Sequence, residues 1–260
     1  MHAIGSAPDA SDPGLAPGAK ELRSALKEAR NVAALTGAGI SAESGVPTFR
    51  GAGGLWRNYS PEKLATLEAF EANPRLVWEW YDWLRGVMRE AQPNPGHQAL
   101  AELARRHAAP DGKGSFTLIT QNIDGLDDRA GSKNIVKLHG DIWIMWCMGC
   151  HREERDERAR LEVLPPRCKK CGALLRPGIV WFGEPLPADE WERGVEAAAS
   201  ADIFLVIGTS ATVYPAAGLA SIARQSGAKL AIVNKEPTPV DDIAEWVLQG
   251  PSGEVLPRLL

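Results

Sequence analysis

Five short apolar runs, each closed by glycine or polar residues, restrict the folds open to this chain of 260 residues. The runs lie at residues 32–35, 116–119, 135–138, 203–207 and 230–233. Apolar residues with helical spacing lie beside or between several of them, at residues 20–30, 188–200 and 215–225. Runs that are apolar on both faces suit parallel strands covered by helices. The pattern predicts an α/β fold, a Rossmann-like doubly wound parallel sheet.

The four cysteines fall in two C-x2-C pairs separated by seventeen residues, namely Cys147, Cys150, Cys168 and Cys171. Two such tight turns place four sulfur atoms at the corners of a tetrahedron, the geometry of a structural Zn²⁺ site. Two disulfides or a redox pair are the alternatives, and both are disfavoured because residues 1–18 lack the parts of an export signal. Four protein ligands leave no position for water or substrate, so we expect one zinc ion with a purely structural role.

Two segments interrupt the alternation of strands and helices, one rich in helix formers and tryptophan and one that holds the cysteines. We therefore expect a small zinc-binding and helical lobe made of a helical module at residues 55–107 and a zinc module at residues 141–175. Both would be inserted into a single domain of residues 19–260. Residues 1–18 are rich in Pro, Gly, Ala and Ser and are expected to form a disordered tail.

The overall composition gives weak constraints on partners. With 44% apolar residues the chain can bury a substantial core, and its net charge of −4 arises from basic and acidic residues scattered along the sequence. No stretch reaches the ~20 apolar residues that cross a bilayer. We expect a cytoplasmic, monomeric protein that neither enters a membrane nor binds nucleic acid directly.

A glycine-rich turn follows the first apolar run. Gly37, Ala38, Gly39 and Ala42 fit the G-x-G-x-x-G/A pattern, in which backbone N–H groups approach a pyrophosphate. An ordinary strand-to-helix turn is the alternative. The acidic residue expected ~20 positions later in a dinucleotide fold has no clean equivalent. A long glycine-rich loop stands there instead, and such loops commonly cover ligands.

Polar residues also follow the other predicted strands, where open α/β sheets bind ligands. These sets are Gln121, Asn122, Ile123 and Asp124; His139; Gly208, Thr209 and Ser210; and Asn234, Lys235 and Glu236. His139 is the candidate general base, because an imidazole titrates near neutral pH. His97, His107 and His151 are expected at the surface or in capping roles.

Together these motifs resemble the sirtuin family of NAD-dependent protein lysine deacylases, from about residue 19 to the last residue. Residues 37–51 (GAGISAESGVPTFRG) are similar to the family's NAD-binding loop, residues 121–126 (QNIDGL) to its second signature, and residues 138–140 (LHG) to its catalytic histidine segment. The paired cysteines, Gly208 to Ser210, and Asn234 follow in the family's order. The resemblance implies a Rossmann domain with a small lobe, and a cleft between them where NAD and acyl-lysine meet.

The resemblance also assigns roles to residues. Catalysis would use His139 and Asn122. The NAD-binding residues would be Gly37, Ala38, Gly39, Ala42, Phe49, Arg50, Trp56, Gln121, Asn122, Ile123, Asp124, Gly208, Thr209, Ser210, Asn234, Lys235, Glu236 and Ser252. The substrate would contact Tyr81 and a strand of Val180, Trp181, Phe182, Gly183 and Glu184 that pairs with the peptide backbone.

The implied reaction moves an acyl group from a protein lysine to ADP-ribose and releases nicotinamide, with deacetylation as the main activity. Mono-ADP-ribosyl transfer at the same site is one alternative. A non-catalytic NAD or zinc-ribbon binding module is another, although its basic pair, Lys169 and Lys170, is a small footprint for nucleic acid. A conventional dehydrogenase is a third alternative, but this chain lacks the acidic ribose ligand that is usual in such enzymes.

The acyl preference is predicted from one helix. Tyr81 resembles the subgroup that removes succinyl or malonyl groups through a Tyr-x-x-Arg pair. Here Leu84 occupies the arginine position, and Arg85 is one residue further, about 100° around the helix. We therefore expect neutral acyl groups to be removed faster than succinyl.

Overall fold

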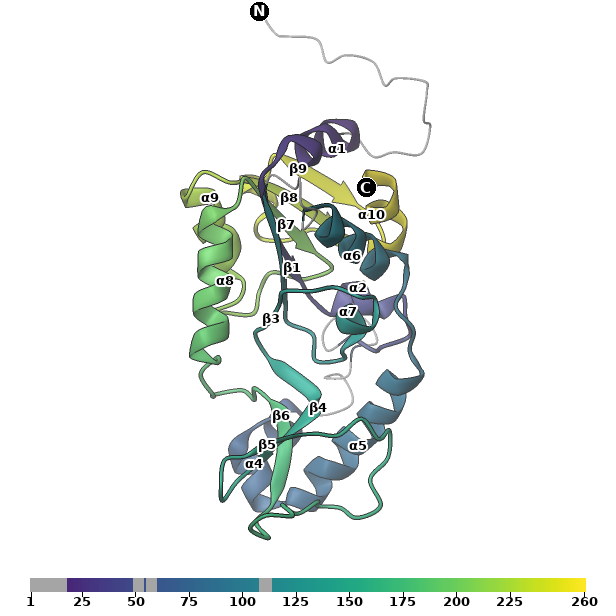
Figure 1. Ribbon diagram of the computed structural model, residues 1–260, viewed down its shortest axis with the longest axis vertical. Coiled ribbons are helices and arrows are strands. Elements are labelled where there is room, and N and C mark those ends of the chain that lie inside the picture. Colours follow the sequence, from purple (N-terminus) through teal and green to yellow (C-terminus); the bar gives the residue numbers. More distant parts are fainter. Residues whose placement is uncertain (1–17, 49–53, 55–59, 108–113) are drawn as a thin grey trace, which may run out of the picture.

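The computed structural model describes residues 18–48, 54, 60–107 and 114–260, and Figure 1 shows that they form a large and a small lobe. The predicted tail at residues 1–18 lies almost wholly outside this part of the chain. Within the described residues, no helix is both long and apolar enough to cross a membrane.

The large lobe contains a six-stranded parallel sheet in the order β3-β2-β1-β7-β8-β9. Its strands are β1 (Asn31–Thr36), β2 (Ser115–Thr120), β3 (Ile135–Lys137), β7 (Ile203–Ile207), β8 (Lys229–Asn234) and β9 (Trp246–Gln249). The order reverses between β1 and β7, which is the switch point of a doubly wound fold. The predicted fold class is confirmed. The sequence did not predict β9, which lies at the edge of the sheet and is only partly apolar.

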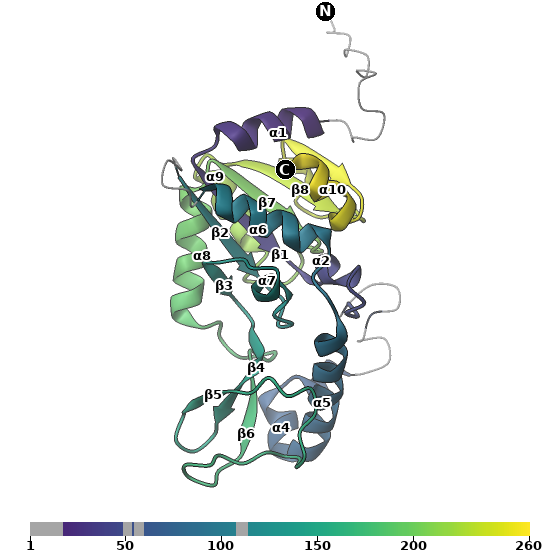
Figure 2. The same ribbon diagram turned by 45° about the vertical axis from the view of Figure 1, so that its right-hand side comes forward.

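Alternate residues of each strand are buried on opposite faces of the sheet. On β1, Val32 and Ala34 join the core under α1 (Ala19–Glu28), α6 (Pro95–His107) and α10 (Ser252–Leu259). Ala33 and Leu35 join the core under α8 (Ala188–Ser200) and α9 (Gly218–Gln225). Figures 1 and 2 show these two helix groups on either side of the strands. This double covering explains why the strands are continuous apolar runs.

The small lobe packs three helices against a three-stranded antiparallel sheet in the order β5-β4-β6. Its elements are α3 (Pro61–Leu64), α4 (Leu67–Ala72), α5 (Pro74–Glu90), β4 (Gly140–Cys147), β5 (Glu153–Arg155) and β6 (Leu175–Ile179). Asn73 caps α5 by accepting a hydrogen bond from the Leu76 N–H. The short elements α2 (Ala38–Ala42), α7 (Leu126–Arg129) and η2 (Asp241–Ile243) lie in connections of the large lobe.

The structure divides the predicted helical module between the two lobes. Helices α3, α4 and α5 belong to the small lobe, whereas α6 lies beside α10 and packs on the parallel sheet through Leu100 and Leu103 (Figure 2). The helical module predicted at residues 55–107 therefore includes one helix, α6, that belongs to the large lobe. The error arises because α6 is amphipathic like its neighbours, and only the packing partner shows which core it joins.

Candidate active site

The glycine turn lies where β1 and β7 meet, at the switch point of the sheet, and it comprises Gly37, Ala38, Gly39 and Ala42. The Gly39 N–H donates to the Gly208 carbonyl oxygen at 2.7 Å. A Cβ atom on Gly39 would lie 2.6 Å from that oxygen, and one on Gly208, whose φ is 57°, would lie 2.3 Å from the Ile40 nitrogen. Only glycine fits where two strand ends come this close.

The second signature follows β2 and faces the glycine turn directly. The buried Asn122 amide donates to the Gly37 carbonyl at 3.0 Å and to Ser41 Oγ at 3.3 Å. Gln121 Nε2 donates to Thr209 Oγ1 at 3.2 Å. The ends of β1, β2 and β7 are therefore joined by side-chain hydrogen bonds, as the strand-end pattern predicted.

Asp124 is buried in the same connection, next to the buried Ile123. Its carboxylate accepts a hydrogen bond from Ser41 Oγ at 2.8 Å and one from the Leu126 N–H at 2.8 Å. Burial raises the pKa of Asp124, and these two hydrogen bonds oppose the rise. The carboxyl group is thus held in one orientation at the edge of the sheet.

His139 forms the corner between β3 and β4, the point at which the chain passes from the large lobe to the small one. Its Nδ1 lies 3.0 Å from the Gln121 carbonyl oxygen. A carbonyl can only accept, so Nδ1 carries the proton of this hydrogen bond. In the neutral ring the lone pair then resides on Nε2, as a general base requires.

His97 and Ser41 are site residues that the sequence analysis did not assign. His97 was expected at the surface or in a cap, but it is fully buried, and its Nε2 lies 3.4 Å from Ser41 Oγ. Its Nδ1 accepts from the Asn94 N–H at 3.3 Å, and Ser41 donates its only proton to Asp124. His97 Nε2 is therefore the donor toward Ser41. Burial lowers the pKa of His97 to about 4, so the ring is neutral.

The remaining predicted NAD-binding residues that the structure describes lie at the same edge of the sheet. After β7, Thr209 is buried and Ser210 is exposed. Asn234 is the last residue of β8, Lys235 and Glu236 follow it, and the buried Ser252 begins α10. Phe49, Arg50 and Trp56 lie outside the described residues.

The predicted substrate residues form a wall of the small lobe, but residues 180–184 are a loop and not a strand. Strand β6 ends at Ile179 because its partner β4 begins opposite it, at Gly140. Beyond that point the Val180 N–H donates to the His139 carbonyl at 3.0 Å, and the Phe182 N–H donates to Ala65 at 2.9 Å. The Glu184 carboxylate accepts from the Trp181 N–H, which folds the segment into a turn around Gly183.

Three neighbouring side chains bear on the acyl preference. The Tyr81 hydroxyl is buried and accepts a hydrogen bond from Trp181 Nε1 at 3.0 Å. Leu84 is fully buried in the small-lobe core. Arg85 is also fully buried and is bound to main-chain carbonyls and to Asp156, so it points away from the substrate wall, as the helical spacing predicted.

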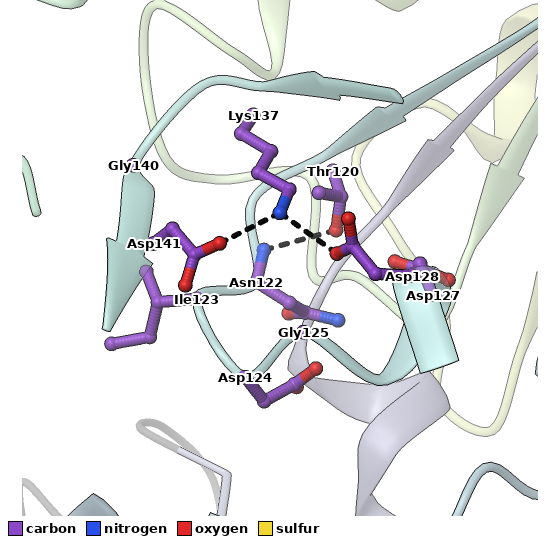
Figure 3. Close-up of a pocket in the computed structure, with 10 residues that line it drawn as sticks. All are labelled: Thr120, Asn122, Ile123, Asp124, Gly125, Asp127, Asp128, Lys137, Gly140 and Asp141. Atoms are coloured by element: carbon purple, nitrogen blue, oxygen red, sulfur yellow. Dashed lines mark hydrogen bonds and ion pairs between the residues drawn. The ribbon is translucent and has the colours of Figure 1, made fainter. Parts of the chain in front are cut away.

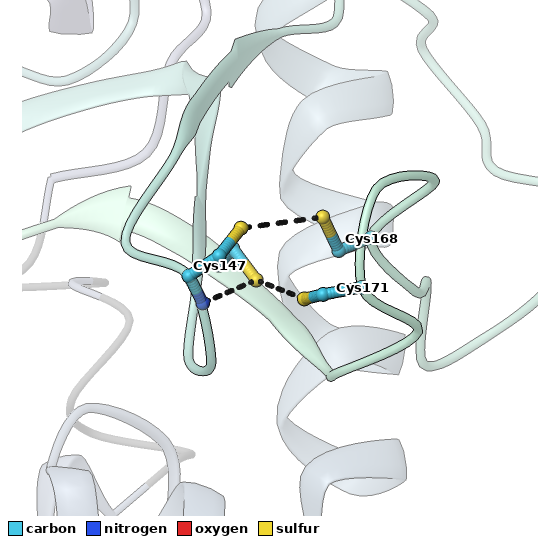
Figure 4. Close-up of side chains that lie close together, drawn as sticks. Cys147, Cys168 and Cys171 are labelled. Atoms are coloured by element: carbon cyan, nitrogen blue, oxygen red, sulfur yellow. Dashed lines mark hydrogen bonds between the residues drawn. The ribbon is translucent and has the colours of Figure 1, made fainter.

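The four cysteines converge in the small lobe, and Figure 4 shows the sulfur atoms of Cys147, Cys168 and Cys171 turned toward one another. All four Sγ atoms lie within 4.8 Å of one another, with Cys147 to Cys171 at 3.4 Å and Cys150 to Cys168 at 3.8 Å. A tetrahedral site with Zn–S bonds of about 2.3 Å requires sulfur pairs about 3.8 Å apart. Disulfide bonds need about 2.0 Å, so the spacing fits a zinc ion and not two disulfides.

Hydrogen bonds around the cysteines also suit a metal site. The N–H groups of Cys150 and Gly149 point at Cys147 Sγ from 3.4 Å. They lower the pKa of Cys147, which favours the thiolate that binds zinc. A Cβ atom on Gly149 would lie 2.7 Å from the Ala173 side chain, so the turn needs glycine.

Fold and site together define a Rossmann-type nucleotide-binding protein whose second lobe carries four cysteines placed to bind a zinc ion. The model of the Sir2 family matches residues 37–215. The chain is 51% identical over 235 residues to NAD-dependent protein deacylase 2 of Pyrobaculum aerophilum, covering 90% of this chain and 92% of that protein. It is 52% identical over 215 residues to an NAD-dependent protein deacylase of Aquifex aeolicus, covering 83% and 87%.

Solved structures of Sir2 homologues are similar to this chain in fold and in sequence. A Sir2 homologue variant in complex with ADP-ribose superposes with a TM-score of 0.87 at 45% identity, covering 92% of this chain and 94% of that one. A Sir2 homologue in complex with NAD gives 0.85 at 44% identity, covering 99% and 94%. The chain belongs to the Sir2 family, which confirms the resemblance found in the sequence.

Proposed function

We propose that this protein is an NAD-dependent protein lysine deacylase. The observation that carries the proposal is the position of His139, whose ring is fixed through Nδ1 at the same sheet edge as the glycine turn, Asn122 and Asp124. The relatives named NAD-dependent protein deacylase support it, as does a Sir2 structure with a p53 peptide and NAD⁺ at 36% identity and a TM-score of 0.80.

The residues of this chain have separate tasks in the proposed reaction. The turn at Gly37 and Gly39 presents backbone to the pyrophosphate, and Asn122 and Asp124 orient the nicotinamide end. When bound, NAD supplies the ribose carbon that the acyl oxygen attacks as nicotinamide leaves. His139 Nε2 would then remove a proton from a ribose hydroxyl, which attacks the acyl carbon so that the lysine amine leaves. With one water added, the products are free lysine, nicotinamide and O-acyl-ADP-ribose.

Replacing His139 by alanine tests this proposal. Loss of a general base costs typically 10²–10⁴-fold in rate, so we expect His139→Ala to lose deacetylation while it keeps its circular dichroism and its zinc. His107→Ala, at the far end of α6, is the matched control and should keep full activity. Peptide and nucleotide products are identified by mass spectrometry. A folded His139→Ala protein with normal turnover would rule out the assigned base, and ADP-ribose attached to protein would indicate the transferase alternative.

For the acyl group, we propose that acetyl and other neutral groups are preferred to succinyl. Leu84 supplies no charge, Arg85 is committed to other partners, and the Tyr81 hydroxyl is already bound to Trp181. Matched acetyl and succinyl peptides compared by kcat/KM test the preference, and a faster succinyl reaction would contradict it. The monomeric state and the cytoplasmic location stay predictions.

A further inference from the structure

A single ammonium group spans the corner that carries His139. Lys137 is the last residue of β3, and Asp141 is the second residue of β4, so the two flank His139 on either side. Lys137 Nζ lies 2.8 Å from Asp141 Oδ2. The Asp141 side chain is 8% exposed and that of Lys137 is 23% exposed, so solvent screens this ion pair less than a surface pair.

The same ammonium also binds helix α7, which follows Asp124, a residue proposed to orient nicotinamide. Lys137 Nζ lies 2.7 Å from Asp128 Oδ2, on the short helix α7 that begins two residues after Asp124. Figure 3 shows the ammonium between the two carboxylates. One cation therefore joins three segments, namely β3, the start of β4, and α7.

Two hydrogen bonds of Trp143 link Asp141 to Asp124. The second oxygen of Asp141, Oδ1, accepts a hydrogen bond from the Trp143 N–H at 2.8 Å. The Trp143 indole N–H donates to the Asp124 carbonyl oxygen at 2.9 Å. A continuous series of contacts therefore runs from Lys137 through Asp141 and Trp143 to the residue proposed to orient nicotinamide.

The charges around Lys137 show what its removal would do. Asp124, Asp127, Asp128 and Asp141 line one pocket with Lys137, and Asp127 and Asp124 are buried. Among the residues that the structure describes, the other cation paired with Asp141 is Arg155, at 3.5 Å and half exposed. Without the ammonium, Asp128 and Asp141 would face each other as like charges, which favours separation of α7 from the His139 corner.

We propose that Lys137 is a positioning residue for deacylation. Its ammonium binds both Asp128 and Asp141, and so holds the corner that carries His139 against helix α7, which follows Asp124. The inference rests on the proposed function. It concerns orientation and not contact with substrate, so the charge of residue 137 should affect turnover more than NAD affinity. Displacements of about 1 Å in an active site can cost about 10²-fold in rate.

The test compares Lys137→Met with Lys137→Arg in the full zinc-loaded protein, with Lys133→Met as the matched control on the exposed turn before β3. We expect Lys137→Met to lower kcat about 10- to 100-fold with KM for NAD changed by less than about threefold. Lys137→Arg keeps the charge and should restore kcat to within about threefold of wild type. Lys133→Met should match the wild type.

An unchanged kcat in folded Lys137→Met would overturn the inference, and so would a loss that Lys137→Arg does not restore. If Lys137→Met does not fold, Asp128→Asn decides, because it removes one arm of the bridge at a half-exposed side chain. Lower kcat at an unchanged unfolding midpoint then supports the inference, and unchanged kcat overturns it. A wild-type protein without NAD-dependent deacylation would instead refute the proposed function, so the two failures are distinguishable.

Discussion

Replacing Arg85 by methionine should destabilise the small lobe without changing the acyl preference. The Arg85 side chain has no exposed surface, and it donates to the carbonyl oxygens of Ile142 at 3.0 Å, Asp156 at 2.5 Å and Arg158 at 2.8 Å. It also pairs with the Asp156 carboxylate at 3.0 Å. These contacts fasten α5 to β4 and to the segment that follows β5.

The magnitude follows from what the substitution leaves behind. Methionine fills most of the space of the arginine stem, so the cost comes from the polar groups and not from a cavity. The buried carbonyl groups of Ile142 and Asp156 and the part-buried carbonyl of Arg158 lose charge-assisted donors, each worth about 1.5–3 kcal/mol. Asp156 keeps Arg158 as a partner, which limits the loss. We expect a decrease of about 3–5 kcal/mol in the free energy of unfolding, the range for breaking a buried ion pair.

Urea denaturation followed by tryptophan fluorescence measures this change, because α5 and β4 both carry tryptophans of the small lobe. Arg89→Met, one turn later on α5 and exposed, is the matched control and should change stability by less than about 0.5 kcal/mol. The ratio of acetyl to succinyl turnover should be the same in Arg85→Met as in the wild type. An unaltered denaturation midpoint combined with a selective loss of succinyl turnover would refute the reasoning, since Arg85 would then be an acyl ligand.

Three further predictions concern the metal, acid stability and the glycine turn. Removing zinc with a chelator should unfold the small lobe and abolish turnover together, as seen by circular dichroism and activity, and lost turnover with an intact fold would contradict a structural role. The pKa of His97 is about 4 in the folded protein and about 6.5 in the unfolded chain, so above pH 6.5 the ring is neutral in both states and costs no stability. As the pH falls from 6.5 to 4, the unfolded chain takes up a proton that the buried ring does not, and the free energy of unfolding should decrease by about 3 kcal/mol. His97→Gln should make the free energy of unfolding less dependent on pH in that range. Gly39→Ala should raise KM for NAD at least about tenfold by forcing Gly208 away, whereas Gly194→Ala, with 3.7 Å to its nearest neighbours, should have no effect.

Features written in continuous stretches of sequence were predicted well. The five apolar runs became the strands β1, β2, β3, β7 and β8, and helix α8 has the predicted bounds. The glycine turn follows β1 and the cysteine pairs cluster as the sequence predicted, because a tight turn or a C-x2-C pair is a local geometry that a few neighbouring residues specify. Parallel strands bring their carboxyl ends to one edge, so even the gathering of His139, Asn122 and Gly208 follows from local patterns and one rule of topology.

Contacts between distant residues were decided only by the tertiary structure. His97 lies 56 positions from Ser41, and Arg85 lies 71 positions from Asp156, so no spacing in the sequence could pair them. The core that α6 joins and the point at which β6 ends were set in the same way, by which neighbour each element meets. The sequence by itself determined the family, five of the six strands of the parallel sheet and the four cysteines that cluster. Packing determined which buried polar groups are partners, because burial makes an unpaired polar group costly and so selects among contacts that the sequence permits equally.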